Sequence, residues 1–375
     1  MKIVQIIPSL ENVGGAETFV VSLTIELIKQ GHDVTIISLY NHRQGFYSEI
    51  INDNKIKILY LNKKKGPDYK TAKQLKKLII NLNPDAVHSH LETALTFFLG
   101  GILKLKNITF VETIHYYLQP NSYNIILKTI IKNSYKRKKI VPVSISPEAK
   151  KRATSYYKIN FDSPIIYNGI NMSGIKAEKP INTREFDFIA VSRLAEVKNH
   201  QAIIKAAKIL KERNLDFSLN IVGDGPLYDE ISLLIRNYKL ESNIHLLGLR
   251  NDVYSLLANH KIFLIPSFRE GNPISAIEAI SSGLAIIGTN NGGLVDLIVD
   301  DNVGFLVNPY DIEQLANYME LLLSDKKKLS VISEHNKLYS ASFSISHVAT
   351  QYIALYEKLI KVKKTDKKSR RKPNV

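Results

Sequence analysis

The sequence contains no cysteine and no tryptophan among its 375 residues. Without cysteine, neither a disulfide nor a cysteine-ligated metal site can form, which fits a reducing compartment. A long hydrophobic run is missing as well, because the longest one, residues 94–103, is about half of the length that a membrane helix needs. The apolar run at the N-terminus is too short for a signal peptide. We therefore expect a cytoplasmic protein.

What is present is ordinary for a globular protein, with 45% hydrophobic and 23% charged residues. This composition excludes a mainly disordered chain, a collagen-like rod and a coiled coil. The length predicts two domains or one large one. The net charge of +16 is uneven, because the basic excess lies in residues 1–180 and 361–375 while residues 181–360 are slightly acidic. Such asymmetry suggests that the first half faces a polyanionic surface.

Two series of alternating strands and helices follow one another along the chain. Strands are predicted at Lys2–Ile7, Val34–Leu39, Lys55–Leu61, Ala86–Ser89, Ile108–Thr113 and Ile140–Ser144, and again at Phe186–Val191, Ser218–Val222, Ile244–Leu247, Ile262–Pro266, Ala285–Gly288 and Gly304–Val307. Helices are predicted at 18–30, 70–81, 92–104 and 122–138, and again at 199–213, 227–238, 252–258, 273–282, 311–323 and 345–361. Strands that alternate with helices are typical of parallel sheets.

We therefore predict an α/β protein made of two Rossmann-like, doubly wound domains that face a central cleft. The first domain covers residues 1–167 and the second covers residues 168–344. A last helix at 345–361 precedes a basic, disordered tail at 362–375. Ligands of such sheets bind beyond the carboxyl ends of the strands, so the residues that follow the strands are the candidates for a site.

Two motifs in the first half follow strands. Gly14 and Gly15 open the first helix, where free N–H groups favour a phosphate, although a tight turn would also require glycine. His115 ends a strand and can donate to a sugar hydroxyl or a phosphate. His88 and His90 lie at the end of the preceding strand. No zinc-site spacing accompanies these histidines, and a purely structural role is the alternative, for His88 above all.

Three motifs in the second half carry cations or glycine at strand ends. Arg193 and Lys198 follow the first strand and suit a diphosphate, although ordinary surface cations would look the same. Gly223 follows the next strand and permits close approach of a ligand, or is a simple turn. Arg250 lies in a loop whose backbone could read a base, and Asp252 of that loop could equally be a helix cap.

The most specific motif runs from Glu270 to Glu278. Glu270 ends a strand, and Gly271, Asn272, Pro273 and Ile274 lead into the following helix. The N–H groups of that segment would face the same ligand as Glu270. Glu278 stands inside an apolar helical run, where a carboxylate is costly unless it is hydrogen-bonded, and the two vicinal hydroxyls of a ribose would satisfy it. The alternative is a solvent-facing Glu278 with Glu270 as a helix cap.

Together these motifs, with Asn168-Gly169-Ile170 at the hinge, resemble glycosyltransferase family 4, whose members have the GT-B fold. The resemblance spans nearly the whole chain. Two positions depart from the family pattern: Leu294 follows Gly292-Gly293 where an acid is common, and Asn272 stands where phenylalanine is frequent.

The resemblance implies a role for each motif. Arg193 and Lys198 bind the diphosphate, and Glu270 approaches the donor sugar. Glu278 binds the ribose, and His115 lies beside the transferred sugar. The implied catalytic set is therefore Arg193, Lys198, Glu270 and His115. The donor-binding set is Gly14, Gly15, Gly223, Arg250, Gly271, Asn272, Pro273, Ile274 and Glu278. The first domain binds the acceptor, and the last helix returns to that domain.

The implied reaction moves a hexose or N-acetylhexosamine from a nucleotide diphosphate sugar, most commonly a UDP sugar, to a saccharide acceptor. The resemblance implies retention of the anomeric configuration and no required metal or other cofactor. The acceptor is expected to be lipid-linked, in the synthesis of a bacterial surface polysaccharide or glycoconjugate. Arg193 and Lys198 would stabilise the charge on the leaving diphosphate in a water-poor site.

The basic segment from Ile125 to Ile140 and the basic tail predict contact with an anionic membrane, at the inner face of the plasma membrane. A solvated charged surface is the alternative. A nucleotide-sugar epimerase of the same fold and a non-catalytic partner subunit are competing functions. A nucleic-acid-binding protein is disfavoured, because the second half is acidic and no nucleic-acid-binding module is recognisable.

Overall fold

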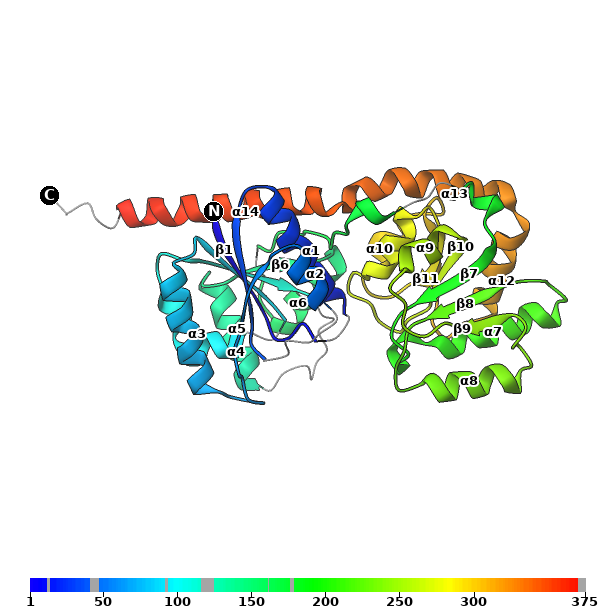
Figure 1. Cartoon of the computed structure of the whole chain (residues 1–375), viewed down its shortest axis with the longest axis horizontal. Coiled ribbons are helices and arrows are strands. Elements are labelled where there is room, and N and C mark those ends of the chain that lie inside the picture. Colours follow the sequence, from blue (N-terminus) through cyan, green and yellow to red (C-terminus); the bar gives the residue numbers. More distant parts are fainter. Residues whose placement is uncertain are drawn as a thin grey trace. The chain divides into compact units, whose positions relative to one another are not determined.

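A computed structural model describes residues 1–11, 14–40, 47–91, 94–115, 125–160, 162–175 and 179–369. The chain forms two compact units: unit 1 comprises Met1–Gly169 and Ile345–Val375, and unit 2 comprises Ile170–Ser344 (Figure 1). The first unit therefore extends to Gly169, slightly beyond the predicted boundary at residue 167. The predicted element ends at 92–93, 122–124 and 370–375 lie outside the described residues.

Unit 1 is built on a six-stranded parallel sheet in the order β3-β2-β1-β4-β5-β6. Its strands are β1 (Lys2–Ile7), β2 (Asp33–Ser38), β3 (Lys57–Tyr60), β4 (Ala86–His90), β5 (Thr109–Ile114) and β6 (Val141–Ser144). Valine and isoleucine dominate these strands because helices cover both faces of the sheet. The order reverses between β1 and β4, and at such a switch point a doubly wound sheet binds its ligand.

The helices of unit 1 lie in two layers. They are α1 (Gly15–Lys29), α2 (Ser48–Asp53), α3 (Tyr69–Leu82), α4 (Ala94–Gly100), α5 (Ile125–Lys136), α6 (Pro147–Tyr157) and α14 (Ile345–Ser369). Helices α3, α4 and α5 gather on one side of the sheet, while α1 and α14 lie side by side on the other (Figure 1). In the described part of the chain, no helix is long and apolar enough to cross a bilayer.

The predicted continuous helix over 92–104 is wrong. Helix α4 ends at Gly100, and a separate 3-10 turn follows at Ile102–Lys104. Gly101 between them has a φ of 60°, a left-handed conformation that favours glycine and stops an α-helix. At Gly100 a Cβ would lie 2.6 Å from the carbonyl oxygen of Ala72, so glycine also allows α4 to approach α3 closely.

Helix α14 is fastened to the sheet of unit 1 by two fully buried tyrosines. The hydroxyl of Tyr352 is hydrogen-bonded to Thr113 Oγ1 (2.7 Å), and the hydroxyl of Tyr356 to His88 Nδ1 (2.6 Å). The sequence around Tyr352 and Tyr356 does not indicate these hydrogen bonds, because the residues to which the two tyrosines bind lie more than 200 positions away. The C-terminal helix is therefore an integral layer of unit 1.

The helix also continues beyond its predicted end at residue 361, through Ser369. The amine of Lys363 donates to the carbonyl oxygen of Ile108 and lies 5.8 Å from the centre of the Phe110 ring. These contacts extend the docked helix into the segment that we predicted to be a disordered tail. That prediction is therefore wrong for residues 362–369.

Unit 2 repeats the same architecture. Its sheet has the order β12-β11-β10-β7-β8-β9, and every neighbouring pair is parallel. The strands are β7 (Phe186–Val191), β8 (Leu219–Val222), β9 (Ile244–Leu246), β10 (His260–Ile265), β11 (Ala285–Thr289) and β12 (Gly304–Val307). The switch point of this sheet lies between β7 and β10, so the loops after these two strands define its ligand-binding edge.

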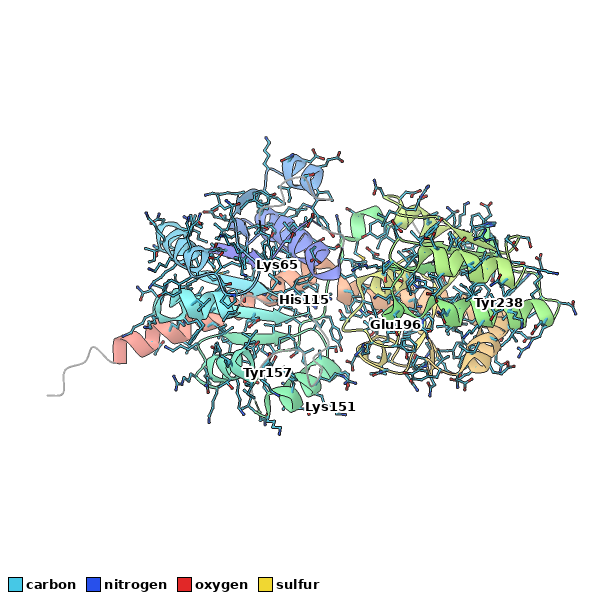
Figure 2. All side chains as sticks on the ribbon, turned by 90° about the horizontal axis from the view of Figure 1, so that it is seen from below. Lys65, His115, Lys151, Tyr157, Glu196 and Tyr238 are labelled. Atoms are coloured by element: carbon cyan, nitrogen blue, oxygen red, sulfur yellow. The ribbon has the colours of Figure 1, made fainter. Side chains whose placement is uncertain are left out.

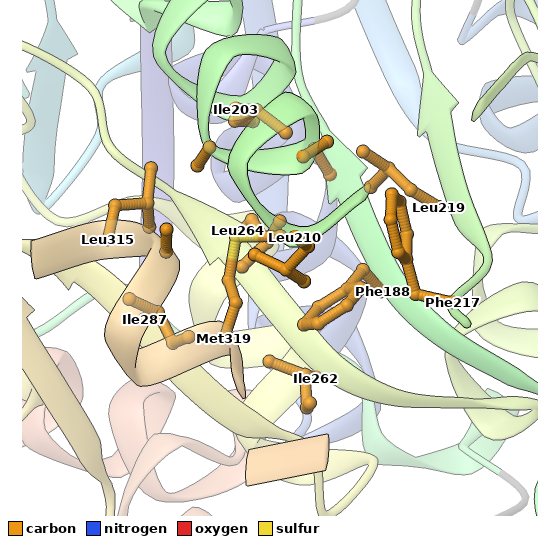
Figure 3. Packing of buried hydrophobic residues seen from close by; sticks show 14 of the residues in the cluster. Phe188, Ile203, Leu210, Phe217, Leu219, Ile262, Leu264, Ile287, Leu315 and Met319 are labelled. Carbon is orange, nitrogen blue, oxygen red and sulfur yellow. The ribbon is translucent and has the colours of Figure 1, made fainter. Parts of the chain in front are cut away.

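The helices of unit 2 are α7 (His200–Glu212), α8 (Tyr228–Asn237), α9 (Val253–Ala258), α10 (Ile274–Ser281), α11 (Leu294–Leu297), α12 (Ile312–Ser324) and α13 (Lys326–Tyr339). Short 3-10 turns occur at Met172–Gly174, Ile181–Thr183, Glu196–Lys198 and Ser340–Phe343. Figure 3 shows the core on one face, where Ile203 and Leu210 of α7 and Leu315 and Met319 of α12 pack on the strands. Their spacing of roughly one or two turns places these side chains on one side of each helix.

The prediction missed α6 and α13, although both have start signals. Ser146 caps α6, accepting a hydrogen bond from the N–H of Ala149 (3.1 Å), and Pro147 occupies the first turn. Asp325 caps α13 in the same way, through the N–H of Lys328 (2.8 Å). Both caps have the side-chain type and position that favour a helix start.

The docking of α14 can be tested by replacing Tyr356 with phenylalanine. This change leaves His88 Nδ1 buried without its hydroxyl partner, so we expect the free energy of unfolding to fall by about 1–3 kcal/mol. Urea denaturation followed by circular dichroism measures the loss. Tyr69 is 58% exposed, so Tyr69→Phe should change stability by less than about 0.5 kcal/mol. Equal effects of the two substitutions would contradict the docking role of the Tyr356 hydroxyl.

Candidate active site

The loop after β7 in unit 2 is fixed by its neighbours. Asn199, at the end of this loop, adopts a left-handed conformation with a φ of 54°. Its side-chain amide donates to the carbonyl oxygens of Pro266 (3.0 Å) and Pro309 (2.9 Å), which follow β10 and β12. Three strand ends are thereby joined through one side chain, and the preceding residues 193–198 are held at the ligand-binding edge.

Lys198 and Glu270 meet at the switch point of unit 2. The amine of Lys198, after β7, lies 2.7 Å from Glu270 Oε1, after β10. The side chain of Glu270 is only 8% exposed and that of Lys198 is 23% exposed, so the pair is largely withdrawn from water. Burying either charge alone would be costly, and pairing offsets that cost. The structure thus brings together two residues that the sequence placed 72 positions apart.

Arg193 lies in the same loop as Lys198 but is exposed. Its guanidinium makes no hydrogen bond and no ion pair with any of the described residues, so this group is available to a ligand. An arginine can bind two phosphate oxygens at once, whereas a lysine acts as a point charge. One free and one paired cation therefore stand at this sheet edge.

Glycines let four loops of unit 2 pack against one another. A Cβ on Gly293 would lie 1.5 Å from the carbonyl oxygen of Gly271, and one on Gly292 would lie 2.2 Å from that of Glu270. A Cβ on Gly223 would lie 2.0 Å from the carbonyl oxygen of Ser192. No other residue fits at these three positions without moving backbone. The glycines thus bring the loops after β7, β8, β10 and β11 close together.

The segment Gly271–Ile274 leads into α10. Pro273 occupies the cap position of the helix, and Asn272 beside it is buried. The N–H groups of Ile274 and Ser275 have no hydrogen-bond acceptor among the described residues. Because the first N–H groups of a helix attract negative or hydroxyl oxygen, this end of α10 can bind a polar ligand.

Glu278 lies inside α10 with its carboxyl group withdrawn from water. Burial raises the pKa of this carboxyl to about 7, and a hydrogen bond from the hydroxyl of Tyr254 in α9 partly offsets the effect. The same burial raises the pKa of Tyr254. The two side chains are thus a half-buried, hydrogen-bonded pair. Sequence reasoning found Glu278 but missed Tyr254, because nothing in helix α9 signals a partner 24 positions away.

The side chain of Arg250 is paired with Asp252 in the same loop. Its guanidinium donates two hydrogen bonds to the carboxylate of Asp252, from Nε (2.8 Å) and from Nη2 (2.7 Å). Both side chains are almost half exposed. Asp252 stands at the cap position of α9, as the alternative held, but its side chain accepts no hydrogen bond from the first turn of that helix.

In unit 1 the candidate residues lie at the carboxyl ends of β1, β4 and β5. His115, labelled in Figure 2, follows β5. Its Nε2 lies 2.9 Å from Nδ1 of His90 at the end of β4. Nε2 of His90 lies 2.6 Å from Oε1 of Gln5 in β1. Burial lowers the pKa of His115 to about 3 and that of His90 well below its ordinary value. These rings are therefore neutral at neutral pH.

His88 is structural, as its alternative interpretation held. Its Nε2 is hydrogen-bonded to Thr113 Oγ1 (2.7 Å) and its Nδ1 to the hydroxyl of Tyr356 (2.6 Å), so both ring nitrogens are occupied inside the core. In the part of the chain that the structure describes, no group of three or more histidine, aspartate or glutamate side chains could hold a metal ion.

Gly14 and Gly15 stand at the beginning of α1. Gly14 is the cap residue of the helix, and its carbonyl oxygen accepts hydrogen bonds from both the N–H and the hydroxyl of Thr18, each at 2.9 Å. Glu17 in the first turn is partly buried, and desolvation raises the pKa of its carboxyl. A carboxylate near a helix N-terminus competes with an anionic ligand for the same N–H groups.

Two family profiles match successive halves of this chain. The family described as "Glycosyltransferase Family 4" matches residues 13–173, and the family described as "Glycosyl transferases group 1" matches residues 172–339. The two matches meet close to the boundary between the two units. Together with the two Rossmann-like units, they identify the class of protein: the chain belongs to the family 4 glycosyltransferases of the GT-B type.

The most informative relatives are bacterial enzymes. The chain is 24% identical to N-acetyl-alpha-D-glucosaminyl L-malate synthase of Bacillus anthracis, over 95% of this chain and 97% of the relative. It is 34% identical to UDP-Gal:alpha-D-GlcNAc-diphosphoundecaprenol alpha-1,3-galactosyltransferase of Escherichia coli, over 41% of each chain. The solved structure of Anabaena HepE in complex with UDP matches with a TM-score of 0.81 at 18% identity, over 96% of this chain and all of the other. At that identity the likeness shows the fold alone.

The buried carboxyl of Glu278 gives a pH-dependent prediction for the ligand-free protein. Its folded pKa of about 7 exceeds the ordinary value of about 4.3. Between these values the unfolded chain releases the proton and the folded chain keeps it, so this group makes stability fall as the pH rises. We therefore expect the free energy of unfolding of Glu278→Gln, relative to that of the wild type, to increase by about 1–3 kcal/mol between pH 5 and pH 8.

Urea denaturation at the two pH values measures this gain. Glu241→Gln is the matched control, because Glu241 is exposed on the same unit and should show no such growth. If the two substitutions respond alike to pH, the carboxyl of Glu278 is not buried as described.

Proposed function

We propose that this glycosyltransferase moves a hexose or N-acetylhexosamine from a UDP sugar to a lipid-linked saccharide, with retention of the anomeric configuration. The observation that carries the proposal is the meeting of Lys198 and Glu270 at the switch point of unit 2, beside the unpaired Arg193. Cations, a carboxylate and free helix N–H groups at one sheet edge suit a diphosphate joined to a sugar.

The chemical step breaks the bond between the anomeric carbon and the diphosphate. Negative charge then grows on the leaving diphosphate, and Arg193 and Lys198 stabilise it. Lys198 already forms an ion pair with Glu270, so the arriving diphosphate competes with a carboxylate for the same amine. Glu270 then faces the sugar, together with the free N–H groups of Ile274 and Ser275. No dedicated nucleophile is assigned, and the diphosphate itself takes the proton of the acceptor hydroxyl.

The nucleoside is held by groups of unit 2. The two ribose hydroxyls donate to the carboxylate of Glu278, which replaces water with hydrogen bonds and favours its ionised form. Backbone groups of the loop around Arg250 contact the base, and Gly223 permits the close approach of the diphosphate. Gly14 and Gly15 contribute N–H groups to the phosphates from unit 1, and His115 lies beside the transferred sugar. The reaction is proposed to need no metal ion.

The choice of substrates is supported by the names of the relatives. The Escherichia coli relative is a galactosyltransferase that uses UDP-Gal and a diphosphoundecaprenol-linked sugar. The Campylobacter jejuni relative, 30% identical over 49% of this chain and 51% of its own length, is an N-acetylgalactosaminyltransferase acting on a diphospho-undecaprenol-linked sugar. We propose a place in surface polysaccharide synthesis, which the names of these two relatives support, and the cytoplasm as the location of the protein. The anomeric configuration of the product, read by proton NMR, tests retention.

Thermal unfolding with UDP, GDP, ADP and their glucose conjugates tests the donor. At 100 times its dissociation constant a ligand adds about 2.7 kcal/mol, so UDP and UDP-glucose should raise the melting temperature of the wild type. The Glu278→Gln variant should lose most of that gain, and the matched Glu241→Gln variant should keep it. The proposal fails if no nucleotide stabilises the protein, or if Glu278→Gln is stabilised as strongly as the wild type.

Lys198→Ala tests the leaving-group role. Loss of one preorganised cation should lower kcat by about 10²–10³, because the charge that it stabilises develops in the transition state. Lys208→Ala, on the outer surface of α7, should leave kcat unchanged. If Lys198→Ala raised only KM, the amine would bind substrate and transition state equally and would have no catalytic role.

Unit 1 also carries the proposed membrane contact. Ile125 and Ile126 at the start of α5 are 74% and 68% exposed, and residues 136–139 at its end are exposed and basic. An anionic leaflet would attract these cations by about 1 kcal/mol each, and the isoleucines would insert. This proposal places the protein at the inner face of the plasma membrane, close to a lipid-linked acceptor.

Sedimentation with phosphatidylglycerol vesicles tests this contact. Burying one isoleucine contributes about 1.5–3 kcal/mol, so Ile126→Ser should weaken vesicle binding about tenfold or more. Ile80→Ser is the matched control, because Ile80 is 51% exposed on α3 and should not matter. Absence of binding to anionic vesicles at low salt would exclude the membrane contact.

A further inference from the structure

A row of polar side chains crosses the sheet of unit 1 at its switch point. Gln5 of β1, His90 of β4 and His115 after β5 are linked by two short contacts, of 2.6 Å and 2.9 Å. Phe19 of α1 packs edge-on against His115, with ring centres 5.3 Å apart, and helps to fix that ring. Gln5 and His90 are fully buried, so these contacts are shielded from water.

Because the two histidine rings are neutral, the hydrogen bonds of this row must all run in the same donor-to-acceptor direction. A neutral imidazole carries one N–H and one bare nitrogen, so each ring must donate at one end and accept at the other. Burial keeps both His90 and His115 neutral. Their rings are also close to His88, whose centre is 4.1 Å from that of His90, which further disfavours a positive charge.

The side-chain amide of Gln5 sets the direction. Its carbonyl oxygen Oε1 faces Nε2 of His90 and can only accept, so Nε2 of His90 carries the proton. Nδ1 of His90 is then bare and accepts from Nε2–H of His115. Nδ1 of His115 is left as a bare nitrogen, and it is buried with no partner among the described residues.

We propose that Gln5 is a positioning residue that fixes, through His90, the tautomer in which Nδ1 of His115 accepts a hydrogen bond. A sugar hydroxyl can donate to that nitrogen, whereas the oxygens of a diphosphate diester carry no proton and would be repelled by its lone pair. His115 therefore recognises a hydroxyl of the sugar and not the diphosphate. This conclusion about the ligand rests on the proposed function, while the tautomer itself does not.

Nitrogen-15 NMR of the full-length protein labelled at histidine reads the tautomer directly. A bare and a protonated ring nitrogen give well-separated signals, and the signals lost in His115→Asn assign that ring. We expect His115 in the wild type to carry its proton on Nε2. A proton on Nδ1, or a doubly protonated ring at neutral pH, would overturn the proposal.

The substitution Gln5→Met tests whether Gln5 fixes the tautomer of His115, because methionine has nearly the same size but no carbonyl oxygen. Without the carbonyl oxygen, either direction of the row leaves Nε2 of His90 without a partner, so His115 should become a mixture of tautomers. Thr109→Val is the matched control, because Thr109 is buried in β5 and its hydroxyl takes no part in the row. The role of Gln5 is excluded if Gln5→Met leaves the tautomer of His115 unchanged, or if Thr109→Val alters it equally.

Ligand titration tests the hydroxyl. UDP-glucose, but not UDP, should shift the Nδ1 signal of His115, and Gln5→Met should lower kcat about two- to tenfold with unchanged UDP affinity. An equal shift with UDP, or no shift with UDP-glucose although it raises the melting temperature, would overturn recognition of the sugar by His115. If UDP-glucose does not raise the melting temperature at all, the proposed function fails instead, and the tautomer of His115 remains as measured.

Discussion

Burial of both faces of a parallel sheet is the constraint on which the arrangement of this protein depends. Each unit places helices on both sides of its six strands, so the buried side chains of the strands are mainly apolar. The candidate polar side chains of unit 2 are confined to the loops after the strands, where backbone N–H groups and loop glycines are also available. In unit 2 this confinement brings Lys198 and Glu270 into contact, and it leaves Arg193 exposed beside them.

The same constraint explains why buried charge is sparse and specific. Burial raises the pKa of Glu278 in α10 to about 7, and a hydrogen bond from its neutral partner Tyr254 partly offsets this rise. A carboxyl in this state gains more from a ligand that donates hydroxyl hydrogen bonds than an exposed one would. Glu270 belongs to the same motif but forms an ion pair with a cation, Lys198. Two carboxylates of one motif thus have different electrostatic surroundings.

Unit 1 departs from the apolar rule on one face of its sheet. Gln5, His88 and His90 replace apolar side chains there, and α14 covers them with Tyr352 and Tyr356. Hydrogen bonds satisfy most of these polar atoms, which is required for burial at acceptable cost. A helix from the far end of the chain therefore packs on the face of the sheet that carries the histidines, and it contacts His88 directly.

The sequence by itself determined the alternation of strands and helices and the set of motif residues at strand ends, because both follow from local patterns of apolar side chains and glycine. Local patterns also contained signals for α6 and α13 that we overlooked. Only the tertiary structure decided that Tyr254 reaches Glu278 and that α14 runs on through residue 369. Only the tertiary structure brought the side chains of Gln5, His90 and His115 into contact. Such contacts join residues on different elements, and their geometry depends on strand order and helix packing, which local propensity does not encode.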